Sequence, residues 1–162
     1  MACTIRGIRT SQYTALEEFP YGAVFVPPRT PSPDRNVLQH PDIALYTGGF
    51  GAQPDDHGLV ALVGDTIVGA VWARIMEDYG HVDDETPWLA MSVLPAHRGR
   101  GIGADLLRRM LKHLRGKGYW QVSLSVQKAN YAVWLYTKAG FTVYRRNADD
   151  LIMVCALQKE NV

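Results

Sequence analysis

The stretch Val93-Leu94-Pro95-Ala96-His97-Arg98-Gly99-Arg100-Gly101-Ile102-Gly103-Ala104 joins an apolar segment to the start of an amphipathic one. Its three glycines stand at every second position and lack a Cβ, so the backbone there can approach a ligand closely. Unpaired N–H groups and the positive end of the helix dipole suit such a helix start to a phosphate or pyrophosphate. Arg98 and Arg100 add positive charge. We therefore interpret this stretch as an anion-binding turn between a strand and a helix.

Two alternative interpretations of the glycines compete with this one. In the first, the glycines have no role other than to permit a tight turn, although three glycines are more than a turn requires. Residues 99–104 also match the G-x-G-x-x-G/A fingerprint of NAD- and FAD-binding domains. That fingerprint needs an acidic residue about 20 residues further on, whereas the next strand ends Ser125-Val126-Gln127. Too little chain follows to complete a doubly wound sheet, so the context disfavours a dinucleotide site.

The segments on either side of the glycine turn predict a strand, a helix and a second strand. Residues 88–93 form an apolar run before the turn, and residues 121–126 alternate apolar and polar side chains. Between them, one helical face carries Leu107, Met110, Leu111 and Leu114. Gly116 is expected to end this helix in a left-handed conformation. The crossover predicts that the two strands are parallel, with the helix on one face of the sheet.

The remaining elements predict a mostly antiparallel sheet around that crossover. We expect a strand at 4–9, a helix at 11–19, a hairpin of 59–63 and 67–75 around Gly64-Asp65, a helix at 130–139 ended by Gly140, and a hairpin of 141–144 and 151–157. The predicted fold class is α/β (α+β), with flanking helices and one parallel strand pair. The chain is expected to form one domain, residues 1–162, with a proline-rich insert at about 20–57.

Composition excludes several classes of protein. The chain has 17 Lys and Arg against 16 Asp and Glu, a balance that provides no global field for nucleic acid or an anionic membrane. Cys3 and Cys155 indicate neither a disulfide framework nor a metal site, and no apolar run approaches the roughly 20 residues of a membrane span. The five histidines are not spaced as metal ligands and are interpreted as surface or loop residues. We expect a cytoplasmic protein without metal, nucleic-acid or membrane partners.

Two motifs resemble those of a known family. Arg98-x-x-Gly101-x-Gly103, after Ser92-Val93-Leu94-Pro95, resembles the pyrophosphate-binding motif of the GNAT superfamily of N-acetyltransferases. Further along, residues 130–141 (Asn-Tyr-Ala-Val-Trp-Leu-Tyr-Thr-Lys-Ala-Gly-Phe) resemble that family's later signature of Asn, Ala, Leu-Tyr and Gly-Phe. Together with the order of elements, the resemblance covers roughly residues 59–157, and the proline-rich insert has no matching counterpart.

The resemblance implies a cosubstrate, acetyl-CoA, and a set of residues that bind it. Backbone groups of Met91 and Val93 would bond the pantetheine arm, where the strand splays from its parallel neighbour. Arg98 is one of the implied cofactor-binding residues. The pyrophosphate would be held by the backbone amides of Gly99, Arg100, Gly101, Ile102, Gly103 and Ala104. Asn130 would contact the cofactor from the other side. Tyr136 would be the general acid that protonates the leaving CoA thiolate, a role open to a phenol of pKa ~10.

The resemblance does not extend to a general base, because many family members carry a glutamate on the strand where this chain reads Trp88-Leu89-Ala90-Met91-Ser92. The nearby Asp83, Asp84 and Glu85, with Glu77, Asp78 and His81, could act through water, or could form a solvated acidic loop. Direct attack by an amine is the implied reaction. A non-catalytic acyl-CoA sensor is the alternative.

The amine acceptor stays open among small amines, antibiotics, polyamines, amino acids, peptide N-termini and protein lysines, and the family is compatible with a homodimer. Aromatic residues could line the acceptor side or pack in the core; they are Tyr21, Phe25, Tyr46, Phe50, Trp72 and Tyr79.

Overall fold

The structure, a computed structural model, describes residues 3–18, 50–75 and 82–158. Its elements are, in chain order, β1 (Cys3–Gly7), the 3-10 helix η1 (Thr10–Glu18), β2 (His57–Val63), β3 (Thr66–Arg74), β4 (Trp88–Val93), the short 3-10 helix η3 (Pro95–His97), α3 (Ile102–Gly116), β5 (Gln121–Gln127), α4 (Ala132–Ala139), β6 (Thr142–Arg146) and β7 (Asp150–Ala156). Most of the predicted insert at about 20–57 lies outside the described residues.

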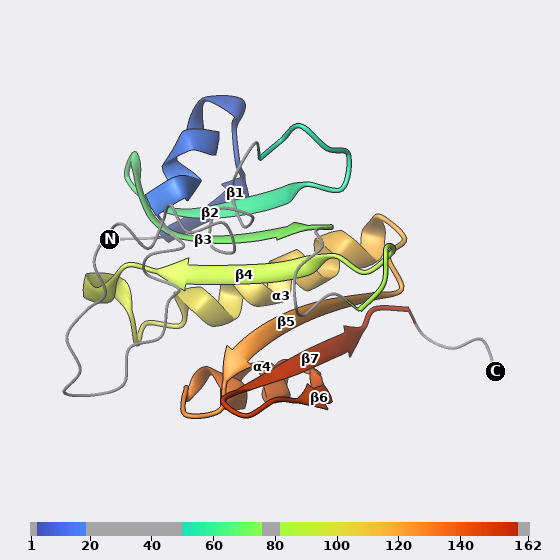
Figure 1. Cartoon of the computed structure of the whole chain (residues 1–162). Coiled ribbons are helices and arrows are strands. Elements are labelled where there is room, and N and C mark those ends of the chain that lie inside the picture. Colours follow the sequence, from blue (N-terminus) through green and yellow to red (C-terminus); the bar gives the residue numbers. More distant parts are fainter. Residues whose placement is uncertain (1–2, 19–49, 76–81, 159–162) are drawn as a thin grey trace.

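The strands form one seven-stranded sheet in the order β1-β2-β3-β4-β5-β7-β6. Every neighbouring pair is antiparallel except β4 and β5, which are parallel and are connected through α3. Figure 1 shows α3 running along one face of this sheet, behind β4. The predicted fold class, a mixed and mostly antiparallel sheet with one parallel pair, is confirmed.

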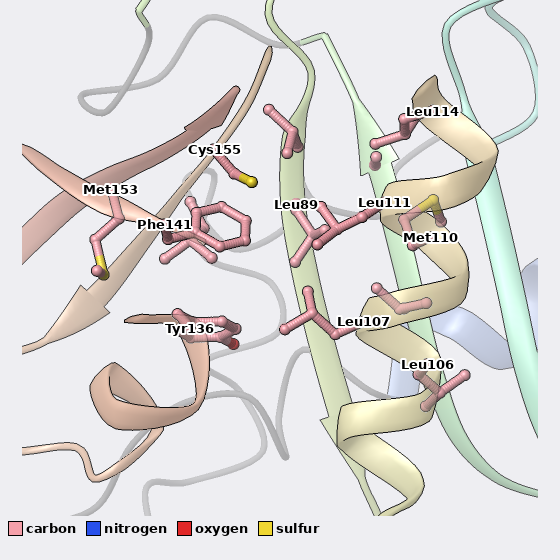
Figure 2. Packing of buried hydrophobic residues seen from close by; sticks show 14 of the residues in the cluster. Leu89, Leu106, Leu107, Met110, Leu111, Leu114, Tyr136, Phe141, Met153 and Cys155 are labelled. Carbon is pink, nitrogen blue, oxygen red and sulfur yellow. The ribbon is translucent and has the colours of Figure 1, made fainter. Parts of the chain in front are cut away.

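Helix α3 packs on the sheet through a continuous apolar face, because residues three and four apart lie on the same side of a helix. Its buried residues are Ile102, Leu106, Leu107, Met110, Leu111 and Leu114. Gly69 of β3 lies beneath it, and a Cβ there would stand 3.2 Å from Cδ1 of Leu106. The same core includes Tyr136 of α4 and Phe141 (Figure 2).

A second cluster lies on the opposite face of the sheet, since alternate residues of a strand point to opposite sides. It contains Leu16, Phe50, Val60, Leu62, Ala70 and Trp72. Phe50 and Trp72 were two of the six aromatic residues considered for the acceptor side. Both side chains are buried in this cluster, which supports the core-packing interpretation for these two.

The end of α3 corrects one prediction. Gly116 is still helical, and Gly118 is the residue that adopts the left-handed conformation, with φ 91°. The N–H of Tyr119 bonds the carbonyl of Leu114 at 3.2 Å, and that of Gly118 bonds Arg115 at 3.1 Å. These two bonds define a Schellman motif, which requires its left-handed residue at Gly118 rather than Gly116. A glycine at either position satisfies the sequence pattern, so the pattern alone could not choose between them.

This correction predicts opposite effects for two alanine substitutions. Gly116→Ala should raise the free energy of unfolding by about 0.5–1 kcal/mol, because alanine is the better helix former and the site is open. Gly118→Ala should lower it by about 1–2 kcal/mol, because a Cβ strains the left-handed conformation. Urea unfolding of the two variants beside the parent measures both changes. A loss of stability in Gly116→Ala would contradict the helix end described above.

Other predicted boundaries differ by a few residues. Strand β1 ends at Gly7 rather than at residue 9, residues 10–18 form a 3-10 helix rather than an α-helix, and β6 runs over 142–146 rather than 141–144. Helix α4 begins at Ala132 instead of residue 130, after its N-cap Tyr131, and Asn130 lies in the turn before it. Gly140 does end α4 in a left-handed conformation, with φ 111°, as predicted.

Candidate active site

Strands β4 and β5 are fastened together only at their N-terminal ends. Within the described residues their register consists of one pair, Trp88 and Ser123. The N–H of Ser123 donates to the carbonyl of Pro87 at 2.9 Å, and Nε2 of Gln121 donates to Oγ1 of Thr86 at 3.0 Å. Beyond this closed end the strands diverge toward their C-terminal ends (Figure 1). The splay expected of this parallel pair is therefore present, as a wedge that opens toward the glycine turn.

Asp83 stabilises the closed end of the wedge. Its Oδ1 accepts the N–H of Glu85 at 2.8 Å and the hydroxyl of Thr86 at 2.7 Å, and its Oδ2 accepts Nε2 of Gln121 at 3.4 Å. The hydrogen bond from Thr86 is the main cause that lowers the pKa of this exposed carboxyl. A carboxylate held by three donors is a poor base. Of the other candidate bases, Asp84 and Glu85 are exposed, and Glu77, Asp78 and His81 lie outside the described residues.

The edge of β4 that faces the wedge carries the backbone groups of Met91 and Val93. The N–H of Leu94 donates to the carbonyl of Val68 at 2.8 Å, and β4 pairs with β3 through Val93 opposite Gly69 and Met91 opposite Val71. Because hydrogen-bonded and non-hydrogen-bonded pairs alternate in an antiparallel ladder, Met91 and Val93 direct their N–H and C=O groups away from β3. The two predicted pantetheine-binding residues therefore present their backbone groups to the wedge.

The glycine turn leads into helix α3, whose N-terminus has no side-chain cap. Gly99 and Gly101 have φ values of 78° and 81°, and Gly101 caps α3 without a side-chain hydrogen bond. A Cβ at either position would meet nothing within 4 Å, so the backbone conformation, not packing, requires glycine. The first intrahelical bond runs from the N–H of Asp105 to the carbonyl of Gly101. The N–H groups of Ile102, Gly103 and Ala104 therefore have no helical partner, and the dipole makes this end attractive to an anion.

Gly103 differs from the other two glycines, because it lies inside α3 and a Cβ there would stand 3.5 Å from Cε of Met91. This short distance means that the first turn of the helix lies close to the Met91 side chain of β4.

Arg98 braces the end of β4. Its Nε donates to the carbonyl of Val93 at 2.9 Å, so part of its donor capacity serves the strand and not an anion. Arg100 is exposed beside it. The motif indicates both residues for the anion site but could not predict the bond to Val93, because a motif does not specify the direction of an arginine side chain.

Asn130 and Tyr136 lie on the β5 side of the wedge. Oδ1 of Asn130 accepts the N–H of Ala132 at 2.9 Å, so the side-chain oxygen is engaged at the start of α4 and any contact with a cofactor would fall to the amide nitrogen. Tyr136 is the buried residue of α4, with its ring edge-on to Phe141 at 5.7 Å between centroids. Burial raises the pKa of Tyr136 to about 12. Its hydroxyl points from α4 toward the β4 and α3 side of the core (Figure 2), and it stays protonated near neutral pH.

Two histidines that were interpreted as surface residues are instead partly buried and bonded to each other. Nε2 of His113 and Nδ1 of His57 are 3.0 Å apart. They lie 56 residues apart in sequence, and no short-range pattern signals such a contact. Among the described residues, no group of three or more His, Cys, Asp or Glu side chains is arranged to hold a metal ion.

Comparison with solved structures identifies the same fold elsewhere. The ribosomal-protein-S18-alanine N-acetyltransferase of Escherichia coli superposes with a TM-score of 0.69 at 16% identity, over 99% of this chain and 97% of that one. A GNAT family acetyltransferase of Brucella melitensis, solved in complex with acetyl-CoA, gives a TM-score of 0.64 at 22% identity, over 99% and 92%. At these identities the likeness shows the fold.

Comparison of sequences identifies relatives and a family. The mycothiol acetyltransferase of Streptosporangium roseum is 37% identical over 78 residues, which are 47% of this chain and 23% of that relative. The match thus spans about a quarter of the relative's length. The model of the Acetyltransferase (GNAT) family matches residues 17–141, a range that contains the wedge, the glycine turn and Tyr136. The chain belongs to the GNAT acetyltransferase family, as its two motifs predicted.

Proposed function

We propose that this protein transfers an acetyl group from acetyl-CoA to a primary amine, by direct attack within a ternary complex. The observation that carries the proposal is the wedge between β4 and β5, where the β4 edge at Met91 and Val93 does not pair with β5 and leads to the start of α3, which has no side-chain cap. Such an edge can pair with the amides of a pantetheine arm, and the helix start can accept a pyrophosphate. The complex of the Brucella melitensis protein with acetyl-CoA supports this choice of cosubstrate.

Each residue then has a defined task. The amides of residues 99–104 hold the pyrophosphate, Met91 and Val93 align the arm, and a β4 amide polarises the thioester carbonyl. The neutral amine nitrogen attacks the carbonyl carbon and the C–S bond breaks. Tyr136 gives its proton to the leaving thiolate. The Tyr136 phenolate then regains a proton, through solvent, from the ammonium nitrogen that the attack formed. The step needs no metal, and Asp83 is not assigned as its base.

Titration calorimetry with acetyl-CoA, followed by a thiol-release assay with a panel of amines, tests the proposal. We expect saturable binding at one site and CoA release that depends on an added amine. Absence of binding would refute the cofactor assignment. Binding without turnover for any small amine, peptide N-terminus or lysine peptide would instead favour the acyl-CoA sensor, which the lack of a carboxylate on β4 makes the second candidate.

The mycothiol and ribosomal-protein acetyltransferases carry acceptor classes in their names, and both kinds of amine belong in the panel. No helix among the described residues is long and apolar enough to span a membrane. The cytoplasmic location and a homodimer stay predictions from the sequence.

The bond from Arg98 to Val93 predicts a specific effect on cofactor binding. Arg98→Lys keeps the charge but loses the planar Nε donor, so the end of β4 loses its brace. We expect the Kd for acetyl-CoA to rise about tenfold, about 1.4 kcal/mol. Arg100→Lys, a matched change two residues away, should have less effect. An unchanged Kd in Arg98→Lys would mean that Arg98 acts by charge alone, and equal increases in both variants would mean that the bond to Val93 has no special role.

A further inference from the structure

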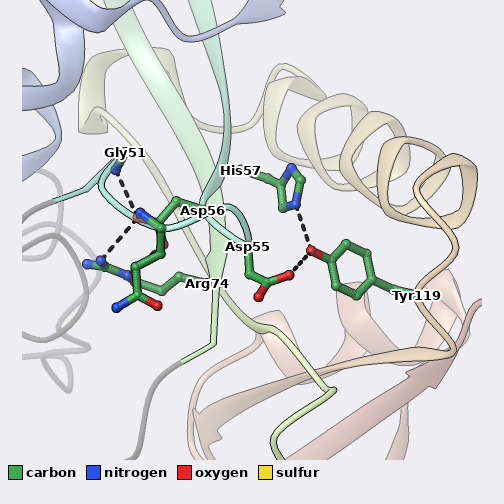
Figure 3. Close-up of polar contacts among 7 residues, drawn as sticks. Gly51, Asp55, Asp56, His57, Arg74 and Tyr119 are labelled. Carbon is green, nitrogen blue, oxygen red and sulfur yellow. Dashed lines mark hydrogen bonds and ion pairs between the residues drawn. The ribbon is translucent and has the colours of Figure 1, made fainter.

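Four polar side chains form a continuous hydrogen-bonded chain away from the wedge. They are Asp55 in the loop 50–56, His57 at the start of β2, His113 near the end of α3, and Tyr119 just after it. The hydroxyl of Tyr119 donates to Oδ1 of Asp55, and Nε2 of His57 lies 3.0 Å from the same hydroxyl (Figure 3). Nε2 of His113 lies 3.0 Å from Nδ1 of His57. We call these four residues the histidine chain.

The chemistry of the donors gives the histidine chain one direction. A carboxylate only accepts, so the Tyr119 proton goes to Asp55 and the phenolic oxygen must accept from His57. His57 therefore carries its proton on Nε2, and its Nδ1 is the acceptor for the Nε2–H of His113. In the neutral state both imidazoles are thus Nε2–H tautomers, and every hydrogen bond in the chain has one donor and one acceptor.

The histidine chain can accept one proton but not two. A first proton on Nδ1 of His113 leaves all three hydrogen bonds intact, because Nε2 of that ring still donates. A second proton must go to Nδ1 of His57, where it would face the N–H of His113 across 3.0 Å. Two donors then oppose each other, and two like charges lie on rings whose centroids are 5.0 Å apart. The second protonation therefore breaks the contact between the two rings.

Nearby charges act on the protonation of the two rings in opposite directions. Asp55 and Asp56 of the loop favour protonation of His57, whereas Lys117 at the end of α3 opposes protonation of both rings. Burial is the largest cause and lowers the pKa of both histidines; the charge of His113 lowers that of His57 further, and Lys117 lowers both. A depressed histidine pKa makes a contribution to stability that is present above pH ~6.5 and lost as pH falls.

The loop 50–56 is anchored at its start and at its end. At its start, Phe50 is buried in the second cluster. At its end, Asp56 accepts the N–H groups of Gly51 and Gln53 at 2.9 and 3.3 Å and pairs with Arg74, whose Nε is 3.1 Å from Oδ1. This pair is buried and contains no histidine. Asp55, the neighbour of Asp56, is held separately by the histidine chain. Loss of the chain would therefore release Asp55 from Tyr119 while Phe50 and the Asp56–Arg74 pair stay in place.

We propose that the histidine chain is a pH-dependent latch that fastens the loop 50–56 to the C-terminal end of α3 and opens when both His57 and His113 are protonated. The latch lies outside the wedge and none of its residues belongs to the proposed acetyl-transfer machinery. Its behaviour can therefore be measured whether or not the protein proves to be an acetyltransferase.

Two measurements on the full chain test the latch. Long-range proton–nitrogen NMR should show Nε2–H tautomers for both histidines at about pH 7.5 and a two-step titration on acidification. Hydrogen exchange of residues 50–56, corrected for intrinsic rates, should be about tenfold faster at about pH 5 than at about pH 7.5, while the amides of β5 and β7 keep their protection.

His113→Gln is the decisive variant, because its amide can donate to Nδ1 of His57 or, when flipped, accept from it. We expect the pH dependence of exchange in the loop to disappear in this variant and to persist in the control His97→Gln. Persistence in His113→Gln, or unchanged loop exchange at a pH where NMR shows both rings protonated, would overturn the proposal. If His113→Gln does not fold, the tautomers of the wild type decide: rapidly exchanging tautomers at about pH 7.5 would refute the chain.

Discussion

Replacement of Tyr136 by phenylalanine is expected to lower kcat about 100-fold and to leave the Kd for acetyl-CoA unchanged. General acid catalysis typically contributes about 100- to 10,000-fold, and the substitution removes only the hydroxyl. Burial raises the pKa of Tyr136 to about 12, so the phenol is fully protonated at the pH of any ordinary assay. The rate of the parent should accordingly show no loss from ionisation of this group below about pH 10.

Stopped-flow or steady-state thiol release, with a separate calorimetric titration, distinguishes the two parameters. The variant should unfold at nearly the parent temperature, because the ring and its contact with Phe141 remain. A fall in affinity with kcat preserved would reassign Tyr136 to cofactor binding. Equal kcat in both proteins would show that another group, or water, protonates the thiolate.

Gly101→Asp is expected to weaken acetyl-CoA binding about 100-fold, about 2.8 kcal/mol. The added carboxylate would lie at the start of α3, where the helix dipole and free N–H groups would otherwise receive a pyrophosphate. Because nothing lies within 4 Å of a Cβ at this position, the substitution introduces charge without a steric clash. A side chain at Gly101 is strained by the φ of 81°, but a negative charge at a helix N-terminus is favourable to the helix and offsets part of this strain, so the variant should still fold.

Gly101→Asn is the matched control. Asparagine tolerates a left-handed conformation about as well as aspartate and has nearly the same shape, so only the charge differs. Calorimetry should give a Kd within about tenfold of the parent for this variant. If asparagine weakened binding as much as aspartate, the loss would come from the side chain's volume, and the electrostatic account of the turn would be wrong.

The hairpins and the parallel crossover could be predicted because their signals are local. The alternation of residues 121–126, the apolar face of α3 and the Gly140 helix end all act within a few residues of chain. The choice between Gly116 and Gly118 could not be made in the same way, because two glycines close together fit the pattern equally well. Only the hydrogen bonds of Tyr119 and Gly118 show where the helix ends.

The candidate site shows the same difference between features with a local sequence signal and features without one. The glycine turn and Tyr136 were visible because a contiguous motif carries them. The bond from Arg98 to the carbonyl of Val93 and the bond that Asn130 accepts from Ala132 depend on side-chain direction, which a motif does not encode. The contact between His57 and His113 joins residues from opposite halves of the chain, and only the folded topology brings them together.

The closed end of the wedge has a consequence for how such a site can diverge over time. Trp88 and Ser123 pair at the closed end of the wedge. A pantetheine arm that enters from the glycine turn would be positioned by backbone groups rather than by any one side chain. Side chains on β4 and β5 could then be substituted while the thioester carbonyl keeps its position in the wedge. A site built from main-chain atoms would persist as long as the fold does, and the fold itself is shared with structures only 16 to 22% identical to this chain.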